Sequence, residues 1–163
     1  MATKTKSTTK SKARRRPARG SGSGSKAGKT PIKRQQPESL RLRSMMPSYT
    51  VNDVQRSVSW YRDGLGFYVE ERWEDGGRLK GVMLRAGSCQ FGLSQDDFSK
   101  GRDREKGVGF RIWCETAQDI DALAARLRAF GGSIIEGPGN QWDMYSFTAQ
   151  DPDGFKITIS QAR

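Results

Sequence analysis

Residues 150–161 read QDPDGFKITISQ, a turn that leads into a short alternating strand, and residues 84–95, LRAGSCQFGLSQ, end in almost the same way. In both stretches apolar and polar residues alternate after a glycine turn, which is the period of a half-buried β-strand. The similarity raises the question of whether one half of the chain repeats the other. The elements that precede each strand answer it.

The first of these strands, residues 89–95, ends a series of five elements. Residues 40–51 predict an opening strand, and residues 52–66 predict a helix with Asn52 as its N-cap. Two more strands are predicted before the last one, at 67–74 and 79–86. The buried face of the helix is expected to carry Val54, Val58, Tyr61 and Leu65.

The same order then starts again. A strand at 108–115 is followed by a helix at 116–132, for which we expect Thr116 as N-cap. Its buried stripe is predicted to be Ile120, Leu123, Leu127 and Phe130. Three strands at 133–137, 143–150 and 155–161 complete the unit. The pattern therefore predicts an α+β domain at residues 39–163, made of two tandem βαβββ modules at about 40–97 and 107–163.

Two motifs of this domain resemble one known family. Residues 51–67, VNDVQRSVSWYRDGLGF, are similar to the first helix of the vicinal oxygen chelate superfamily, and residues 151–159, DPDGFKITI, are similar to its closing turn and strand. That superfamily includes glyoxalase I, extradiol dioxygenases and the fosfomycin- and bleomycin-resistance proteins. The resemblance covers roughly residues 40–161. It implies two curved mixed sheets that enclose a cleft, with the helices on the outer face, and it makes a homodimer a common assembly.

Strand alternation predicts which side chains face the cleft. The aliphatic faces of the strands are expected to lie under the helices, which leaves a mixed face of polar and aromatic residues for the cleft. The opening strand is expected to turn Met46, Ser48 and Thr50 inward. The candidate ligand-binding residues are Trp113, Arg111, Trp142, Gln90, Lys156, Thr158, Tyr145, Met46 and Ser48.

These residues suggest how a ligand is held. Trp113 offers a stacking surface, Arg111 a partner for an anionic group, and Trp142 a contact at the cleft mouth. Trp60, Trp73 and Tyr145 add aromatic surface, although Trp60 and Tyr61 lie in the predicted helix and are expected to be core.

The metal chemistry of the superfamily does not fit this sequence. The resemblance puts the four metal-ligand positions at Met46, Gly92, Gly109 and Thr158, and the chain has no histidine. We therefore expect no metal, no cofactor and no catalytic residue of the family type.

Three functions remain open. The first is a metal-independent protein that binds a small molecule, with sequestration of a toxic or antibiotic compound as one role. The second is an enzyme that uses other groups, for which Lys156, Arg111 and Glu115 are the candidates. The third is a nucleic-acid-associated accessory protein.

The third function comes from the N-terminal tail, residues 1–38. Of the 29 lysines and arginines in the chain, 12 lie in residues 1–37, where there is no acid, and the remaining residues are nearly neutral. Such a segment is expected to be disordered and to contact phosphates through Arg14, Arg15, Arg16 and Arg19. A solubilising arm and an organelle transit peptide are the alternatives. With no apolar signal core or membrane span in the sequence, a cytoplasmic protein is expected, with Cys89 and Cys114 as buried, reduced thiols.

Overall fold

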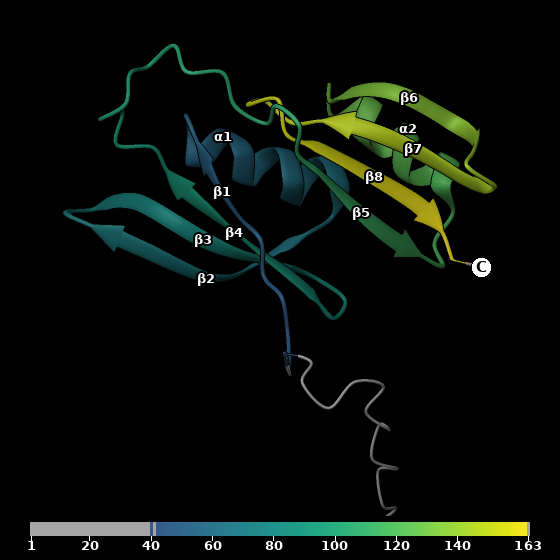
Figure 1. Cartoon of the computed structure of the whole chain (residues 1–163), viewed down its shortest axis with the longest axis horizontal. Coiled ribbons are helices and arrows are strands. Elements are labelled where there is room, and N and C mark those ends of the chain that lie inside the picture. The colour runs from purple at the N-terminus through teal and green to yellow at the C-terminus, as the bar shows by residue number, and fades with distance from the viewer. Residues whose placement is uncertain (1–39, 41, 163) are drawn as a thin grey trace, which may run out of the picture. The chain divides into compact units, whose positions relative to one another are not determined.

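The computed structural model describes Leu40 and residues 42–162, and residues 42–162 belong to one compact unit. Two similar halves follow one another in it (Figure 1). The first half consists of β1 (Ser48–Val51), α1 (Val54–Ser59), the π-helical segment η1 (Trp60–Leu65), β2 (Tyr68–Asp75), β3 (Arg78–Ala86) and β4 (Cys89–Gln95). The second consists of β5 (Arg111–Thr116), α2 (Ile120–Ala129), β6 (Ser133–Gln141), β7 (Met144–Gln150) and β8 (Lys156–Gln161).

Each half contains one mixed four-stranded sheet. The strand order is β1-β4-β3-β2 in the first sheet and β5-β8-β7-β6 in the second. In both, the opening strand pairs in parallel with the last strand, and the other pairs are antiparallel. The predicted α+β fold with two tandem βαβββ modules is therefore confirmed, and the two strands that raised the question, β4 and β8, hold equivalent places.

The helices cover one face of each sheet. α1 contacts β3 and β4, and α2 contacts β6, β7 and β8. The predicted stripe of the first helix, from Val54 to Leu65, is buried. In α2, Ile120 and Leu127 are buried, but Phe130 is 42% exposed, contrary to the prediction, because the helix ends at Ala129 and Phe130 is its C-cap.

Both helices begin later than the sequence predicted. The N-caps are Asp53 and Asp119, whose carboxylates accept hydrogen bonds from the amides of Arg56 and Ala122 at 3.0 Å. Asn52 and Thr116 are not caps: Thr116 is the last residue of β5, which delays the start of α2. β6 is also longer than predicted, because register shifts at residues 134–139 accommodate Pro138 within the strand.

The halves pack together through η1 and α2, which contact each other. At Gly64 there is room for no larger residue without movement, since an added Cβ would lie 2.9 Å from Leu127 Cδ1. Arg126 of α2 donates to the carbonyl oxygens of Asp63 and Arg62 at 3.1 and 3.2 Å, so it caps the end of η1. Module packing and helix termination thus use the same contacts.

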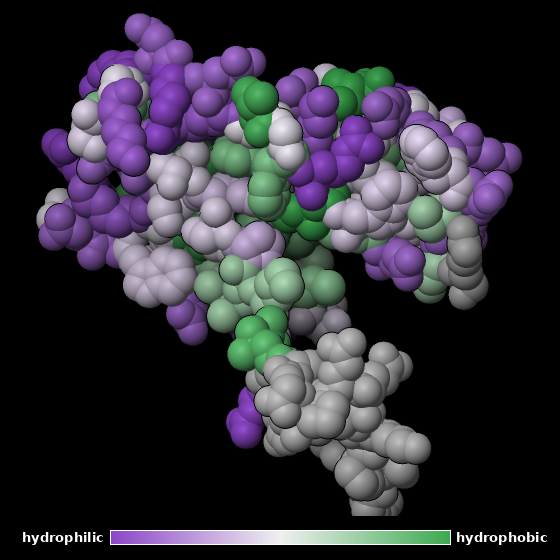
Figure 2. Space-filling view, in the orientation of Figure 1, coloured by the Kyte–Doolittle hydropathy of each residue, from purple (hydrophilic) through white to green (hydrophobic). Residues whose placement is uncertain are grey.

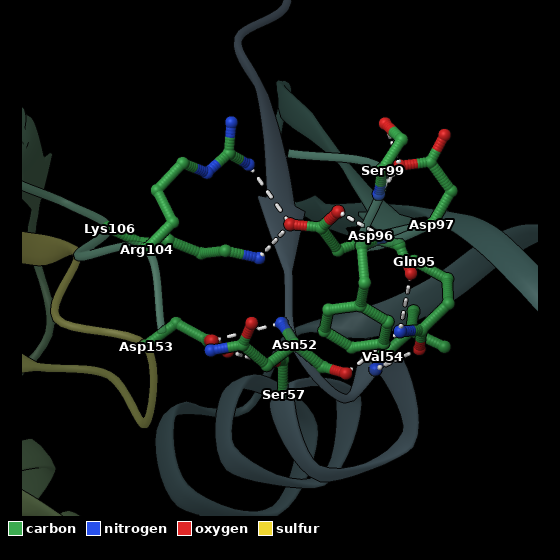
Figure 3. A network of polar contacts seen from close by, with 11 residues as sticks. Asn52, Val54, Ser57, Gln95, Asp96, Asp97, Ser99, Arg104, Lys106 and Asp153 are labelled. Carbon is green, nitrogen blue, oxygen red and sulfur yellow. Dashed lines mark hydrogen bonds and ion pairs between the residues drawn. The ribbon is translucent and has the colours of Figure 1, made fainter. Parts of the chain in front are cut away.

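The two motifs that suggested the family meet in space. Asp151 accepts a hydrogen bond from the Tyr61 hydroxyl at 3.1 Å, and its other oxygen accepts from the amides of Asp153 and Phe155. Asp153 in turn accepts from the amide of Asn52 at 2.9 Å and from the Ser57 hydroxyl at 3.3 Å (Figure 3). The turn at 151–154 therefore fastens the second module to the helix of the first.

The connector between the modules is held by a second polar cluster. Asp96 is buried and lies within ion-pair distance of Lys106 and Arg104, at 2.5 and 2.9 Å (Figure 3). The hydrogen bond from Lys106 is the main reason that the pKa of Asp96 falls to about 2, and the amide of Phe98 adds to the effect. This cluster gives the charged loop a fixed path between β4 and β5.

No helix within residues 42–162 has the length and apolar content needed to cross a bilayer. The predicted basic tail, with Arg14, Arg15, Arg16 and Arg19, and the predicted domain boundary after residue 38 lie outside the described residues.

Candidate functional site

A cavity of about 760 Å³ lies between the two modules. We call it the inter-module cavity. One wall comes from the first module, with Leu65 at the end of η1, Phe67 after it, and residues 86–91 of the β3–β4 hairpin. The facing wall comes from β5, β8 and α2, and residues 43–47 border the opening. Its size is within the range of pockets that enclose a drug-sized molecule.

The walls are mainly apolar. Phe67 and Phe91 contribute aromatic rings on one side, and Ile112, Ile157 and Ile159 contribute aliphatic surface on the other. Polar and charged side chains among the bordering residues are Arg43, Ser44, Ser88, Gln90, Glu115, Thr116 and Gln118. In the orientation of Figure 2, apolar residues gather between the modules, whereas hydrophilic residues dominate the outer parts of both. Such a surface suits an amphipathic molecule.

Three of the candidate residues border this cavity: Met46, Gln90 and Trp113. The Gln90 amide is hydrogen bonded to Glu70, and the Trp113 indole donates to the Ser160 hydroxyl at 3.0 Å. Trp113 is 40% exposed, so much of its ring remains available for contact.

Other candidates lie on the face of the second sheet that no helix covers. Lys156 is level with Arg111, and Thr158 with Trp113, in the β5–β8 pairing. Arg111 lies 3.5 Å from Glu136, and Thr158 is fully buried in a hydroxyl pair with Thr148. Strand parity thus grouped these side chains on one face correctly, but apart from Trp113 they do not border the inter-module cavity.

The remaining candidates are dispersed. Ser48 borders a smaller cavity of about 320 Å³, near Phe110 and Phe155. The Tyr145 hydroxyl donates to the carboxylate of Asp121 in α2. Trp142 is 82% exposed in the β6–β7 turn, away from both cavities. The structure therefore does not bring these three together with Trp113.

Most of the cavity wall was not predicted from the sequence. The wall residues belong to the strand faces that were expected to lie beneath the helices: Phe91, Ile112, Cys114, Ile157 and Ile159. The strand faces are as predicted, but α2 packs on β6, β7 and β8 and leaves the β5 side of this face open to the cavity. Alternation shows which face a residue is on, not how much of that face a helix covers, so no signal in the sequence separates these wall residues from ordinary core.

The residues at the metal-ligand positions of the superfamily do not fit a metal. Met46 offers a thioether, Gly92 and Gly109 have no side chain, and the hydroxyl of Thr158 is engaged with Thr148. Among the residues that the structure describes, no three His, Cys, Asp or Glu side chains are grouped to hold an ion.

The two cysteines differ in their surroundings. Cys114 is half-buried, and burial, followed by the nearby Cys89, raises the pKa of its thiol to about 11. Cys89 is exposed at the cavity edge, which corrects the prediction that both thiols are buried. The difference follows from position, because Cys89 directly follows the turn at the tip of the β3–β4 hairpin.

Comparisons with known proteins agree with this architecture. Residues 43–159 match the Glyoxalase/Bleomycin resistance protein/Dioxygenase superfamily, so the chain belongs to that family. A search of curated protein sequences finds no significant match.

Several solved structures share the fold. Hypothetical protein SA1046 from S. aureus has 19% identity and a TM-score of 0.61, with 76% of this chain and 96% of that chain covered. TioX from Micromonospora sp. ML1 has 18% identity and a TM-score of 0.60, with 72% and 96% covered. TnmS3, described as an antibiotic-binding protein from Streptomyces sp. CB03234, has 22% identity and a TM-score of 0.56, with 76% and 100% covered. At these identities the likeness establishes the fold alone.

Proposed function

We propose that this protein binds an amphipathic small molecule in the inter-module cavity, without help from a metal ion. The observation that carries the proposal is the cavity itself, with its apolar walls and polar rim between two modules. Removing an apolar ligand from water contributes about 25 cal/mol per Å² of buried surface, and aromatic walls such as Phe67 and Phe91 add shape-specific contacts.

The ligand class is narrowed by the walls and by one relative. Glu115 and Arg43 at the rim provide one charge of each sign, so a molecule with an apolar body and a polar edge is favoured over a fully charged one. Since TnmS3 is described as antibiotic-binding, antibiotics and toxic natural products are the first compounds to screen. Sequestration of such a compound is the role that requires binding alone.

A filled cavity tests the proposal. Ile112→Trp places a large ring in the cavity from a half-buried position on its wall. We expect this variant to weaken the binding of the probe dye 1-anilinonaphthalene-8-sulfonate, and of any screening hit, by roughly tenfold or more. The measurement is a fluorescence titration.

Ile135→Trp is the matched control, because Ile135 is exposed on β6 and does not border the cavity. It should bind the probe as the unmodified protein does. Equal binding by all three proteins would show that the ligand site lies elsewhere.

We also propose that two copies of the chain associate. The support is the uncovered faces of the two sheets, which expose Tyr68 and Trp73 on the first and Trp113 on the second. Exposed aromatic residues on open sheet faces are typical of association surfaces.

A further inference from the structure

Both cysteines of the chain border the inter-module cavity, and they reach it from different modules. Cys89 begins β4 and shares its strand face with the cavity residue Phe91, whereas Cys114 lies within β5 and shares its face with Ile112. Neither forms a disulfide. The cavity therefore has one free thiol on each of its two walls.

The two thiols border the same cavity from facing walls, and they are unequal. Burial is the main cause that raises the pKa of the Cys114 thiol, and Cys89 adds to the effect. Cys89 is exposed, so a dissolved oxidant reaches it first. Cys114 is half-buried and remains a protonated thiol at neutral pH. This asymmetry is that of an attacking and a resolving cysteine.

One wall is better able to move than the other. Cys89 pairs with Ala86 in the last rung of the β3–β4 hairpin, next to the turn at Gly87 and Ser88, and around Gly87 there is free space with a positive φ of 56°. Cys114 lies inside the parallel pairing of β5 with β8, opposite Ile159. The last rung of a hairpin opens at lower free-energy cost than the interior of a paired sheet. A movement that brings the sulfur atoms to bonding distance is therefore a movement of the β3–β4 hairpin towards β5, across the cavity.

We propose that Cys89 and Cys114 form a redox pair whose disulfide ties β4 to β5 and closes the inter-module cavity. The proposal rests on the proposed function, because it regulates that same site. The oxidant is a peroxide: the Cys89 thiolate attacks it, the O–O bond breaks, and Cys89 becomes a sulfenic acid as the other oxygen takes up the proton that the thiol released and leaves as water or alcohol. The Cys114 sulfur then displaces the sulfenic hydroxyl, which leaves as water with the Cys114 proton.

Closure and ligand binding exclude each other in this scheme. By linkage, a ligand that occupies the cavity must oppose disulfide formation to the same degree that the disulfide opposes the ligand. The pair therefore predicts two observations: loss of binding on oxidation, and slower oxidation in the presence of ligand.

The test uses the full chain, dilute enough to avoid links between chains, with hydrogen peroxide as oxidant and 1-anilinonaphthalene-8-sulfonate as probe. We expect the intact mass to fall by two hydrogen atoms and a non-reducing peptide map to join Cys89 to Cys114. Probe affinity should fall by roughly tenfold or more and return after dithiothreitol. Saturating probe should slow the appearance of the linked peptide.

Cys89→Ser and Cys114→Ser are the controls. In each, peroxide should leave the probe affinity of that variant unchanged, because no bond can join the walls. A peptide map without the Cys89–Cys114 link overturns the redox pair and leaves the proposed function standing. A link that forms without any change in probe affinity overturns the closure. Reduced protein that binds neither probe nor screened compounds overturns the proposed function, and the closure with it.

Discussion

Asp151 is the residue at which burial and charge conflict most directly. It is 5% exposed, and burial raises its pKa to about 6, although the amides of Phe155 and Asp153 and the Tyr61 hydroxyl all favour the carboxylate. Its pKa is therefore higher in the folded chain than in the unfolded chain, where about 3.9 is usual. Between these two values the folded state binds more protons, so this group makes the protein less stable as the pH rises from about 4 to about 6.

Asp151→Asn should remove this dependence. The amide oxygen can still accept from the two backbone amides, and the side chain carries no charge to desolvate. As the pH rises from about 4 to about 6, the unfolding free energy of the variant should increase relative to that of the unmodified protein. At 1.4 kcal/mol per pKa unit, the increase is at most about 3 kcal/mol. Urea unfolding at several pH values measures the difference.

The exposed Asp103→Asn is the control for replacing a surface carboxylate by an amide, measured in the same way. If the difference in unfolding free energy between Asp151→Asn and the unmodified protein does not change between pH 4 and pH 7, burial does not disfavour the ionised form of Asp151.

At the level of elements, alternation and helical periodicity were sufficient for the order and for the faces of the strands. The predicted starts of the two helices were wrong, because Asn52 and Thr116 were expected as N-caps where Asp53 and Asp119 serve. Each aspartate has another capping residue type nearby in the sequence. Only the path of the preceding strand decides which side chain reaches the free amides. The inter-module cavity could not be predicted for a similar reason. Ile112 and Cys114 have the alternation of covered core residues, and their access to the cavity depends on which strands α2 covers.

The contact between η1 and α2 supports a prediction about Gly66 and Gly131. Both end a helix with a left-handed backbone, at φ values of 89° and 87°, so Gly→Ala at either position should cost about 1 kcal/mol from strain. A Cβ at Gly66 would also lie 2.7 Å from Arg126 Nη1, whereas the space around Gly131 is open. We therefore expect Gly66→Ala to destabilise the protein more than Gly131→Ala in chemical unfolding.

In an Arg126→Ala background the two glycine variants should be destabilised equally, since the guanidinium that a Cβ at Gly66 would displace is then absent. If Gly66→Ala and Gly131→Ala are equally stable while Arg126 is present, the Arg126 side chain moves aside without cost in free energy. Its contacts with η1 then do not stabilise the packing of the modules.

For the whole domain, both sheets have a face without a helix, and each of these faces exposes aromatic side chains. The first carries Tyr68 and Trp73, and the second carries Trp113. In a twofold dimer the first sheet of one copy can face the second sheet of the other twice, so that these aromatic rings leave water. A second copy of the chain is therefore the partner that we propose for these faces.

Trp73→Glu tests this arrangement, because it puts a charge on the first open face without disturbing the buried core. Sedimentation at micromolar concentration should give about twice the chain mass of 18.2 kDa for the unmodified protein and about one chain mass for the variant. Trp142→Glu is the matched control: Trp142 is more exposed still, but it lies on the β6–β7 turn, and its replacement should leave the dimer intact. Circular dichroism should show the same fold for all three. An unmodified protein that sediments as a single chain, or a Trp73→Glu variant that remains dimeric, would contradict the proposed contact between open sheet faces.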